Sequence, residues 1–273
     1  MSETTVRDES RHIAEAFVSA RRAARGLESY PGAIPTSLDQ AYRIQDEAIA
    51  LDGRDILGWK VGRIMPPLAG QYGANRLAGP IFDGTIFFDA QGKPVSMAVF
   101  DAGFGAAEAE YLLRVGTAPD PAQTSFTLDE AAALIDAVHV GIEIASSPLG
   151  AINDLGPAVT ISDFGNNNGL VVGAAIPDWR SLDFAAWPVR LMIDGVEAGE
   201  ASADAMPDGP IGAARFLFEL LAERGIQAKP GQWISSGAVT GVHRVVPGAR
   251  VETFFGSDHR LECLISAATS DRE

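Results

Sequence analysis

The stretch AEAEYLLRVG, residues 107–116, predicts a β-strand whose two faces differ in character. Successive side chains of a strand point to opposite faces, so Glu108 and Glu110 share one face. The other face carries Ala107 and Tyr111, which are suited to a packed core. Two carboxylates side by side on a sheet repel each other unless water or a cation compensates their charge. The strand therefore predicts a sheet that packs through one face and carries acidic side chains on the other.

A second strand, VGIEIAS at residues 140–146, contains a single charged side chain, Glu143. Its neighbours on the same face, Gly141 and Ala145, are small and leave space around the carboxylate. Burying a carboxylate without a partner is unfavourable, so Glu143 is expected to have one. Three carboxylates without cysteine or matched histidine suit a hard divalent ion, Mg²⁺ or Mn²⁺. The same pattern also occurs in strands that bind no ion, and spacing alone does not separate the two.

A lysine interrupts the apolar strand ILGWKVG, residues 56–62. Lys60 either faces water, as most strand lysines do, or takes part in catalysis. Beside the apolar Trp59 it is expected to have a lowered pKa, which suits proton transfer. His139 lies four residues before Glu143, about 13 Å along a strand, too far to share its metal. A hydrogen-bonded structural histidine is the expectation there.

Composition excludes several classes of protein. The chain has 273 residues, of which 47% are hydrophobic and 21% charged, as in ordinary globular proteins. Its single cysteine, Cys263, excludes an intramolecular disulfide and any multi-cysteine metal site. A net charge of −15 argues against nucleic-acid binding and against an anionic membrane surface. An anionic substrate would need a local cation to capture it.

The setting is expected to be cytoplasmic. The N-terminus is polar and acidic, unlike a signal peptide, and no apolar run reaches the length of a membrane span.

Helices and strands are scattered along the chain rather than strictly alternating, and strands dominate its last third, which favours the α+β class. Helices are expected at residues 9–25, at 41–50 with a cap at 37–40 and a stop at Gly53, at 128–137 and at 216–225. Strands are expected at 56–62, 107–115, 140–146, 170–176, 187–197 and over most of 231–268, and loops at 63–84 and 147–169.

Five blocks in this order carry a resemblance to a known family. They are GWKVG (58–62), AEAEYLLRVG (107–116), VHVGIEIASS (138–147), ISDFGNNNGLVVG (161–173) and GQWISSGAVTGVH (231–243). Together they resemble the fumarylacetoacetate hydrolase superfamily. Within it, the chain is similar to the branch of 2-keto-4-pentenoate hydratases and 4-oxalocrotonate decarboxylases, over residues 35–268. AYRIQD at residues 41–46 is similar to the same branch.

The resemblance implies an α+β fold, a mixed β-roll or barrel with helices packed outside. We expect residues 1–55 to form a helical segment that packs on a catalytic β-roll unit at 56–273. The family also implies a homo-oligomer that acts on a small molecule.

The resemblance further assigns roles to residues of this chain. A divalent ion, Mg²⁺ or Mn²⁺, is expected on Glu108, Glu110 and Glu143. Lys60 and Asp163 are expected to be catalytic, Asp163 by positioning a water molecule. The loop Asn166–Asn168 would line or shape the site.

Two positions depart from the family pattern. Ala106 stands two places before Glu108, where members often carry a basic residue. Phe82 stands where members often carry an acid, and Asp83 follows one place later, so a role for Asp83 is in doubt.

The expected reaction is the addition of water to a 2-hydroxy-2,4-dienoate, giving a 4-hydroxy-2-oxo acid, in the breakdown of aromatic compounds. Decarboxylation of 4-oxalocrotonate, hydrolysis of an acylpyruvate and metal-dependent binding without turnover remain alternatives. Hydrolases of the superfamily carry a His–Glu pair after the lysine strand, and residues 63–84 contain neither residue type.

The far end of the substrate separates hydration from decarboxylation, because only the decarboxylase must accept a second carboxylate there. Residues 162–169 offer no cation, but Arg63 and Arg76 leave the question open. For hydration, Leu170 and Val171 are candidates to form a small apolar pocket.

Overall fold

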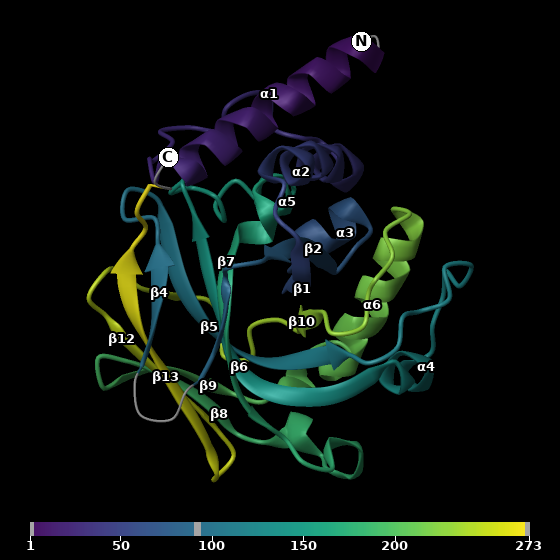
Figure 1. The fold of residues 1–273 in the computed structure, drawn as a ribbon, viewed down its shortest axis with the longest axis vertical. Helices are drawn as coiled ribbons and strands as arrows, with labels where there is room; N and C mark the ends of the chain where they lie inside the picture. The colour runs from purple at the N-terminus through teal and green to yellow at the C-terminus, as the bar shows by residue number, and fades with distance from the viewer. Residues whose placement is uncertain (1–2, 90–93, 271–273) are drawn as a thin grey trace.

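Two β-sheets form the body of the protein in a computed structural model, which describes residues 3–89 and 94–270 (Figure 1). The larger sheet has the order β2-β1-β10-β5-β6-β7-β3, with β11 paired to β5, and the smaller sheet has the order β4-β13-β12-β8-β9. Strands of the larger sheet are β1 (Ile56–Arg63), β2 (Arg76–Phe82), β3 (Ile86–Phe88), β5 (Phe104–Val115), β6 (Ile135–Ser147), β7 (Asn167–Ala175), β10 (Trp233–Ser235) and β11 (His243–Arg244). Those of the smaller sheet are β4 (Val95–Val99), β8 (Val189–Ile193), β9 (Val196–Ala201), β12 (Arg250–Phe255) and β13 (His259–Ala267).

Helices lie outside these sheets (Figure 1). They are α1 (Glu3–Arg22), α2 (Leu38–Asp52), α3 (Leu68–Tyr72), α4 (Leu128–Ala133), α5 (Pro157–Ser162) and α6 (Gly209–Glu223), with short 3₁₀ turns η1 (Phe164–Asn166), η2 (Trp179–Ser181), η3 (Phe184–Ala186) and η4 (Ala203–Ala205). The larger sheet curls into a half-barrel, so the predicted α+β class with a β-roll is confirmed. No described helix is both long and apolar enough to cross a membrane.

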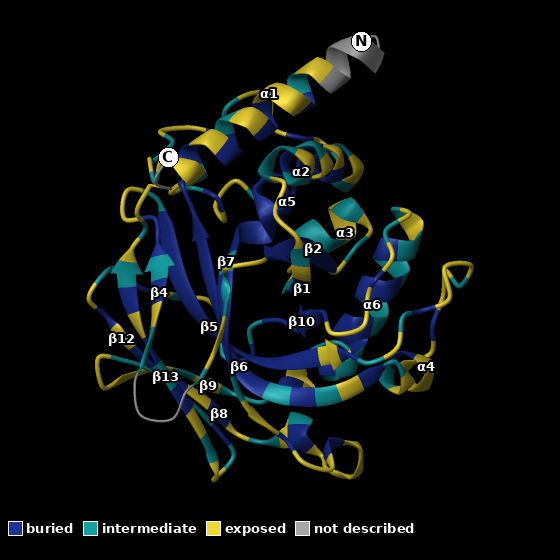
Figure 2. Cartoon of the chain, in the orientation of Figure 1, coloured by how far each residue is buried: buried dark blue, intermediate teal, exposed yellow. Residues whose placement is uncertain are grey.

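The long antiparallel pair of β5 and β6 organises the core. Ala107 and Tyr111 of β5 and Ile142 of β6 are fully buried in the largest apolar cluster, which also takes Leu191 and Val251 from the smaller sheet. Figure 2 shows β5 buried along almost its whole length. The apolar face predicted for residues 107–116 therefore packs between the two sheets.

The N-terminal helices α1 and α2 pack on one end of the larger sheet. Phe17 of α1 and Ile44 of α2 share an apolar cluster with Phe104 and Phe164. The predicted cap of α2 is present, because Ser37 accepts a hydrogen bond from the Gln40 backbone, and the helix ends at Gly53 in a left-handed conformation. The division of the chain at residue 55 stays a prediction.

Residues 63–84 are not the loop that their Gly and Pro content predicts, because they include α3 and β2. Pro80 is tolerated because β2 lies at the edge of its sheet, where one side of the strand needs no N–H donors. Gly79 is required by a close approach, since a Cβ atom there would lie 2.0 Å from the Phe164 carbonyl oxygen. Both Gly79 and Pro80 are therefore compatible with the β-strand β2.

The helix expected at 128–137 ends at Ala133, because the following residues join β6. Ile135 pairs with Val115 of β5, and pairing across the sheet overrides the local helix preference. The loop expected at 147–169 contains α5 and the turn η1, which packs against β2, β1 and β6 of the larger sheet.

Candidate metal centre

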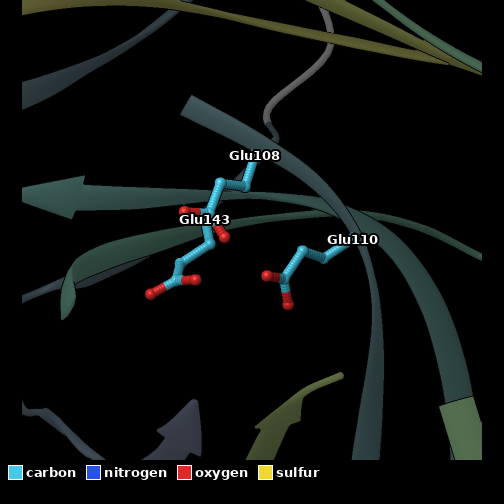
Figure 3. Close-up of side chains that lie close together, drawn as sticks. All are labelled: Glu108, Glu110 and Glu143. Carbon is cyan, nitrogen blue, oxygen red and sulfur yellow. The ribbon is translucent and has the colours of Figure 1, made fainter. Parts of the chain in front are cut away.

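Three carboxylates meet on β5 and β6 (Figure 3). Glu108 faces Glu143 across the antiparallel pair, and Glu110 lies two residues further along the same face of β5. Each side chain offers an oxygen atom, and these atoms all lie within 4.8 Å of one another. Glu110 and Glu143 are fully buried and Glu108 is 4% exposed, so water screens the group poorly. The structure thus brings together the three predicted ligands.

Burial makes this cluster unfavourable without a compensating positive charge. It raises the pKa of Glu108 to about 7, with Lys60 acting in the opposite direction and Glu143 adding to the rise. It also raises the pKa of Glu110 well above its usual range, together with repulsion from Glu143 and Glu108. Such a group either takes up protons or is neutralised by a cation.

The hydrogen bonds to the carboxylates favour binding of a cation over protonation, because they orient the carboxylates and leave other oxygens without a donor. Glu110 Oε2 accepts hydrogen bonds from Ser235 Oγ at 2.5 Å and from the Gly237 backbone N–H at 2.8 Å. Glu110 Oε1 is buried and has no hydrogen-bond donor among the described residues. Glu143 Oε1 accepts from Asn167 Nδ2 at 2.8 Å. Neighbours therefore orient the carboxylates and leave oxygen atoms open, as around a metal, and an all-oxygen set fits a hard divalent ion.

Lys60 extends from β1 into the same cluster. Its side chain is 6% exposed, and its Nζ lies 3.3 Å from Glu143 Oε2. Burial lowers the pKa of Lys60, but Glu143, Glu108 and Glu110 together raise it above its ordinary value. The lowered pKa expected from Trp59 is therefore wrong in direction, because three carboxylates outweigh the apolar surroundings. The carboxylates thus favour the ammonium form of Lys60.

Asp163 is fully buried. Arg21 of α1 binds both of its oxygens, with Nε 2.5 Å from Oδ1 and Nη2 3.0 Å from Oδ2. Arg21 also donates to the backbone oxygens of Ser146 and Asn167, and to Asn168 Oδ1. Asp163 does not line the cavity described below. Its geometry suits holding the 163–168 turn in place rather than positioning a water molecule in the cavity.

The three asparagines of this turn point in different directions. Asn166 lines the cavity, and its Oδ1 is buried without a partner among the described residues. Asn167 donates to Glu143, while Asn168 Nδ2 donates to the Ala98 carbonyl at 2.7 Å. Arg21 thus fixes the turn that orients one of the candidate ligands.

A cavity of about 590 Å³ opens beside the cluster. Lys60, Glu108, Asn166 and Ser236 line its polar part, and Arg63 and Arg76 line another part. Its apolar wall includes Ile64, Met65, Leu68, Leu77, Met206 and Val239. Leu170 and Val171, the residues expected to form the apolar pocket, lie instead in two buried cores. They do so because β7 packs between other strands.

The remaining candidates lie outside the site. Asp83 is exposed and accepts a hydrogen bond from the Gly84 N–H at 2.8 Å, within its own turn. His139 forms a hydrogen bond to the Gly173 carbonyl at 2.9 Å, as expected of a structural histidine. Phe82, at the position of the family acid, packs edge-on against Phe164. Ala106 is buried in the cluster under α1 and α2.

The sequence analysis missed several residues at the site, among them Ser235, Ser236 and Arg21. The two serines belong to the block GQWISSGAVTGVH, so the block was recognised while the role of its serines was not. Ser236 Oγ is buried, lines the cavity and has no hydrogen-bond partner among the described residues. Arg21 lies in an amphipathic helix where nothing in the pattern distinguishes it from a solvated arginine.

Comparisons with known proteins place this geometry in context. No protein-family model matches the chain. A 2-hydroxyhexa-2,4-dienoate hydratase of Comamonas testosteroni is 26% identical over 255 residues, which cover 91% of this chain and 92% of the relative.

Solved structures show the same fold. A 4-oxalocrotonate decarboxylase from Pseudomonas putida G7, complexed with magnesium and adipate, superimposes with a TM-score of 0.78 at 18% identity, covering 97% of this chain and 98% of that chain. A fumarylpyruvate hydrolase from Pseudomonas aeruginosa, in complex with Mn²⁺ and pyruvate, has a TM-score of 0.56 at 15% identity, covering 77% and 88%. The chain therefore has the fold of the fumarylacetoacetate hydrolase superfamily, and its resemblance to the hydratase and decarboxylase branch of that superfamily is confirmed.

Proposed function

We propose that the chain is a hydratase that depends on Mg²⁺ or Mn²⁺ and adds water to a 2-hydroxy-2,4-dienoate, giving a 4-hydroxy-2-oxo acid. The observation that carries the proposal is the buried cluster of Glu108, Glu110 and Glu143, with Lys60 beside it, at the wall of a cavity. The similarity to a dienoate hydratase over nearly the whole chain supports the same reaction. We further propose a homo-oligomer that serves the breakdown of aromatic compounds.

The three glutamates would hold the ion. When bound, a divalent cation supplies a Lewis acid for the carboxylate and the 2-oxygen of the substrate. Its positive charge also offsets the electrostatic repulsion between an anionic substrate and a protein of net charge −15. Asn167, Ser235 and the Gly237 N–H orient the ligands, so the chain provides the preorganised part of the site.

The reaction needs two proton movements and one water molecule. As the dienol becomes a ketone, its hydroxyl proton leaves and C5 gains a proton, which leaves the C3–C4 double bond conjugated with the 2-oxo group. Water then adds its oxygen to C4, and C3 takes a proton. Lys60 in the cavity wall is assigned the transfer of a proton to the substrate and back. An ion on the three glutamates would offset the negative charge that raises the pKa of Lys60, which would let the ammonium group release a proton. Ser236 Oγ and Asn166 Oδ1, both without partners among the described residues, are assigned the positioning of water.

Decarboxylation of a 4-oxalocrotonate-type acid is the second candidate. It uses the same head of the substrate and the same three carboxylates, so the metal centre does not separate it from hydration. The placement of Arg63 and Arg76 in the cavity wall favours it, because a decarboxylase substrate carries a second carboxylate. Hydrolysis of an acylpyruvate is less well supported, because residues 63–84 contain neither His nor Glu.

Product analysis tests the reaction. We expect the purified chain with Mg²⁺ to convert 2-hydroxypenta-2,4-dienoate to 4-hydroxy-2-oxopentanoate, measured by chromatography against a standard. Chelation of the metal should stop the reaction and added Mg²⁺ should restore it. Rapid release of CO₂ from 4-oxalocrotonate, with no hydration of the monoacid, would contradict the proposal in favour of decarboxylation. The absence of turnover on either acid would favour a binding protein.

A further inference from the structure

Arg76 is a buried cation in the cavity wall that forms no ion pair among the described residues. The residue is 5% exposed and lies at the start of the edge strand β2. Its Nη2 donates to the Pro207 carbonyl oxygen, the one hydrogen bond of this guanidinium among the described residues. Asp208 stabilises the charge of Arg76 only at longer range, because its carboxylate forms an ion pair with Arg215 at 2.6 Å. An arginine has five N–H donors, so most of those on Arg76 are available.

A guanidinium buried without a counter-anion is unfavourable, and burial lowers the pKa of Arg76. A second arginine is close by, because Arg63 is the cross-strand partner of Arg76 and lies exposed in the wall of the same cavity. Two cations side by side repel each other unless an anion lies between or beside them. In a chain of net charge −15, this local concentration of positive charge points to an anionic ligand.

The arginines stand at a distance from the carboxylate cluster that suits one small molecule. On the paired strands, Lys60 is opposite Gly79 and Arg63 is opposite Arg76, so the two pairs are three residues, or about 10 Å, apart along the strands. An odd separation points the side chains of Lys60 and Arg63 to opposite faces of the strand, but both residues and Arg76 line the same cavity. Its wall also includes apolar Leu77 and Ile64. The arrangement fits a short carbon chain with a polar group at each end.

We propose that Arg76, assisted by Arg63, binds a second carboxylate at the far end of the substrate. The preferred substrate is then a 2-hydroxydienoic acid that carries a carboxylate at both ends, and a monoacid is a weaker-binding substrate of the same site. This inference rests on the proposed function, which supplies the binding of the 2-oxo end near Lys60. It answers the question that Arg63 and Arg76 left open in the sequence, in favour of a cation at the far end of the pocket.

Binding of two unreactive analogues tests the inference. 2-Oxoadipate and 2-oxohexanoate share the 2-oxo acid head and differ only in the far carboxylate, and neither has a double bond to hydrate. With the Mg²⁺-loaded protein in a calorimeter, we expect 2-oxoadipate to bind about 10- to 100-fold more tightly, as hydrogen bonds between charged groups predict. Arg76→Met should remove most of this difference while leaving the affinity for 2-oxohexanoate within about twofold of the original protein.

The controls separate binding from structure and from net charge. Arg114→Met removes one positive charge from an exposed pair with Asp136, away from the cavity, and should keep the preference for 2-oxoadipate. Arg76→Lys keeps the charge and should retain part of the preference. Equal binding of the two analogues by the original protein, or an equal loss of both in Arg76→Met, overturns the inference. If 2-oxohexanoate does not bind at all, the proposed function is contradicted instead, because that analogue reports on the head site alone.

Discussion

Replacing Glu143 with Gln should lower the affinity for Mg²⁺ by at least about 100-fold and abolish turnover, since removing even the neighbours of metal ligands often costs 10- to 100-fold. The change keeps the shape of the side chain and removes its negative charge. Glu143 lies opposite Glu108 and beside Lys60, so the loss falls at the centre of the cluster. Calorimetric titration of the chelator-treated protein with Mg²⁺ measures the effect.

Glu197→Gln provides the matched control. Glu197 is exposed on β9, and its replacement removes the same charge without touching the cluster. Its Mg²⁺ affinity should stay within about twofold of the original protein, because surface substitutions of this kind are close to neutral. Unchanged Mg²⁺ affinity in Glu143→Gln would show that the ion is held elsewhere.

Replacing Lys60 with Met should lower the turnover number by about 10²–10⁴-fold, the range expected for a lost proton-transfer group. Mg²⁺ affinity should be retained, because the three carboxylates remain and a competing cation has been removed. The paired readout separates catalysis from structure, since a collapsed site would lose both. Steady-state kinetics at saturating Mg²⁺ and titration of the same sample give the two values.

Lys229→Met is the control for this variant. Lys229 is exposed in the loop after α6, so the rate should be unchanged. A Lys60→Met protein that folds, binds Mg²⁺ and retains most of its turnover would reduce Lys60 to a counter-charge for the glutamates.

The central strand pair, β5 and β6, could be predicted because its pattern is local. Alternation along residues 107–115 and 140–146 places acids on one face and apolar residues on the other, and both strands form with these faces. The ends of elements depend on long-range contacts. Nothing near Ile135 marks the switch from α4 to β6, because the partner that decides it is Val115.

Gly and Pro misled the prediction at residues 63–84 for a physical reason. Their usual role in turns was assumed, but Gly79 is needed for a close backbone approach and Pro80 lies on an edge strand. The polar surroundings of the site were similarly out of reach. Arg21 meets Asp163 from 142 residues away, and no sequence period reports such a contact.

The site itself could be predicted only in part from the sequence. Three carboxylates on two strands indicated a shared function, and the order of five blocks gave the family resemblance. The raised pKa of Lys60 was not foreseen, because its sign depends on how closely Glu143 approaches Nζ. The placement of Arg76 was left open for the same reason, since whether a cation on a strand faces water or a cavity depends on the elements packed around it.

One measurement tests the central claim most directly: the position of Mn²⁺ in crystals of the chelator-treated protein grown with MnCl₂, found by anomalous scattering. The account predicts one strong site per chain, bound by oxygens of Glu108, Glu110 and Glu143 at about 2.1 Å, close to the distances of Mg²⁺ sites. Strong anomalous density elsewhere in the chain, with none between these three carboxylates, would contradict it.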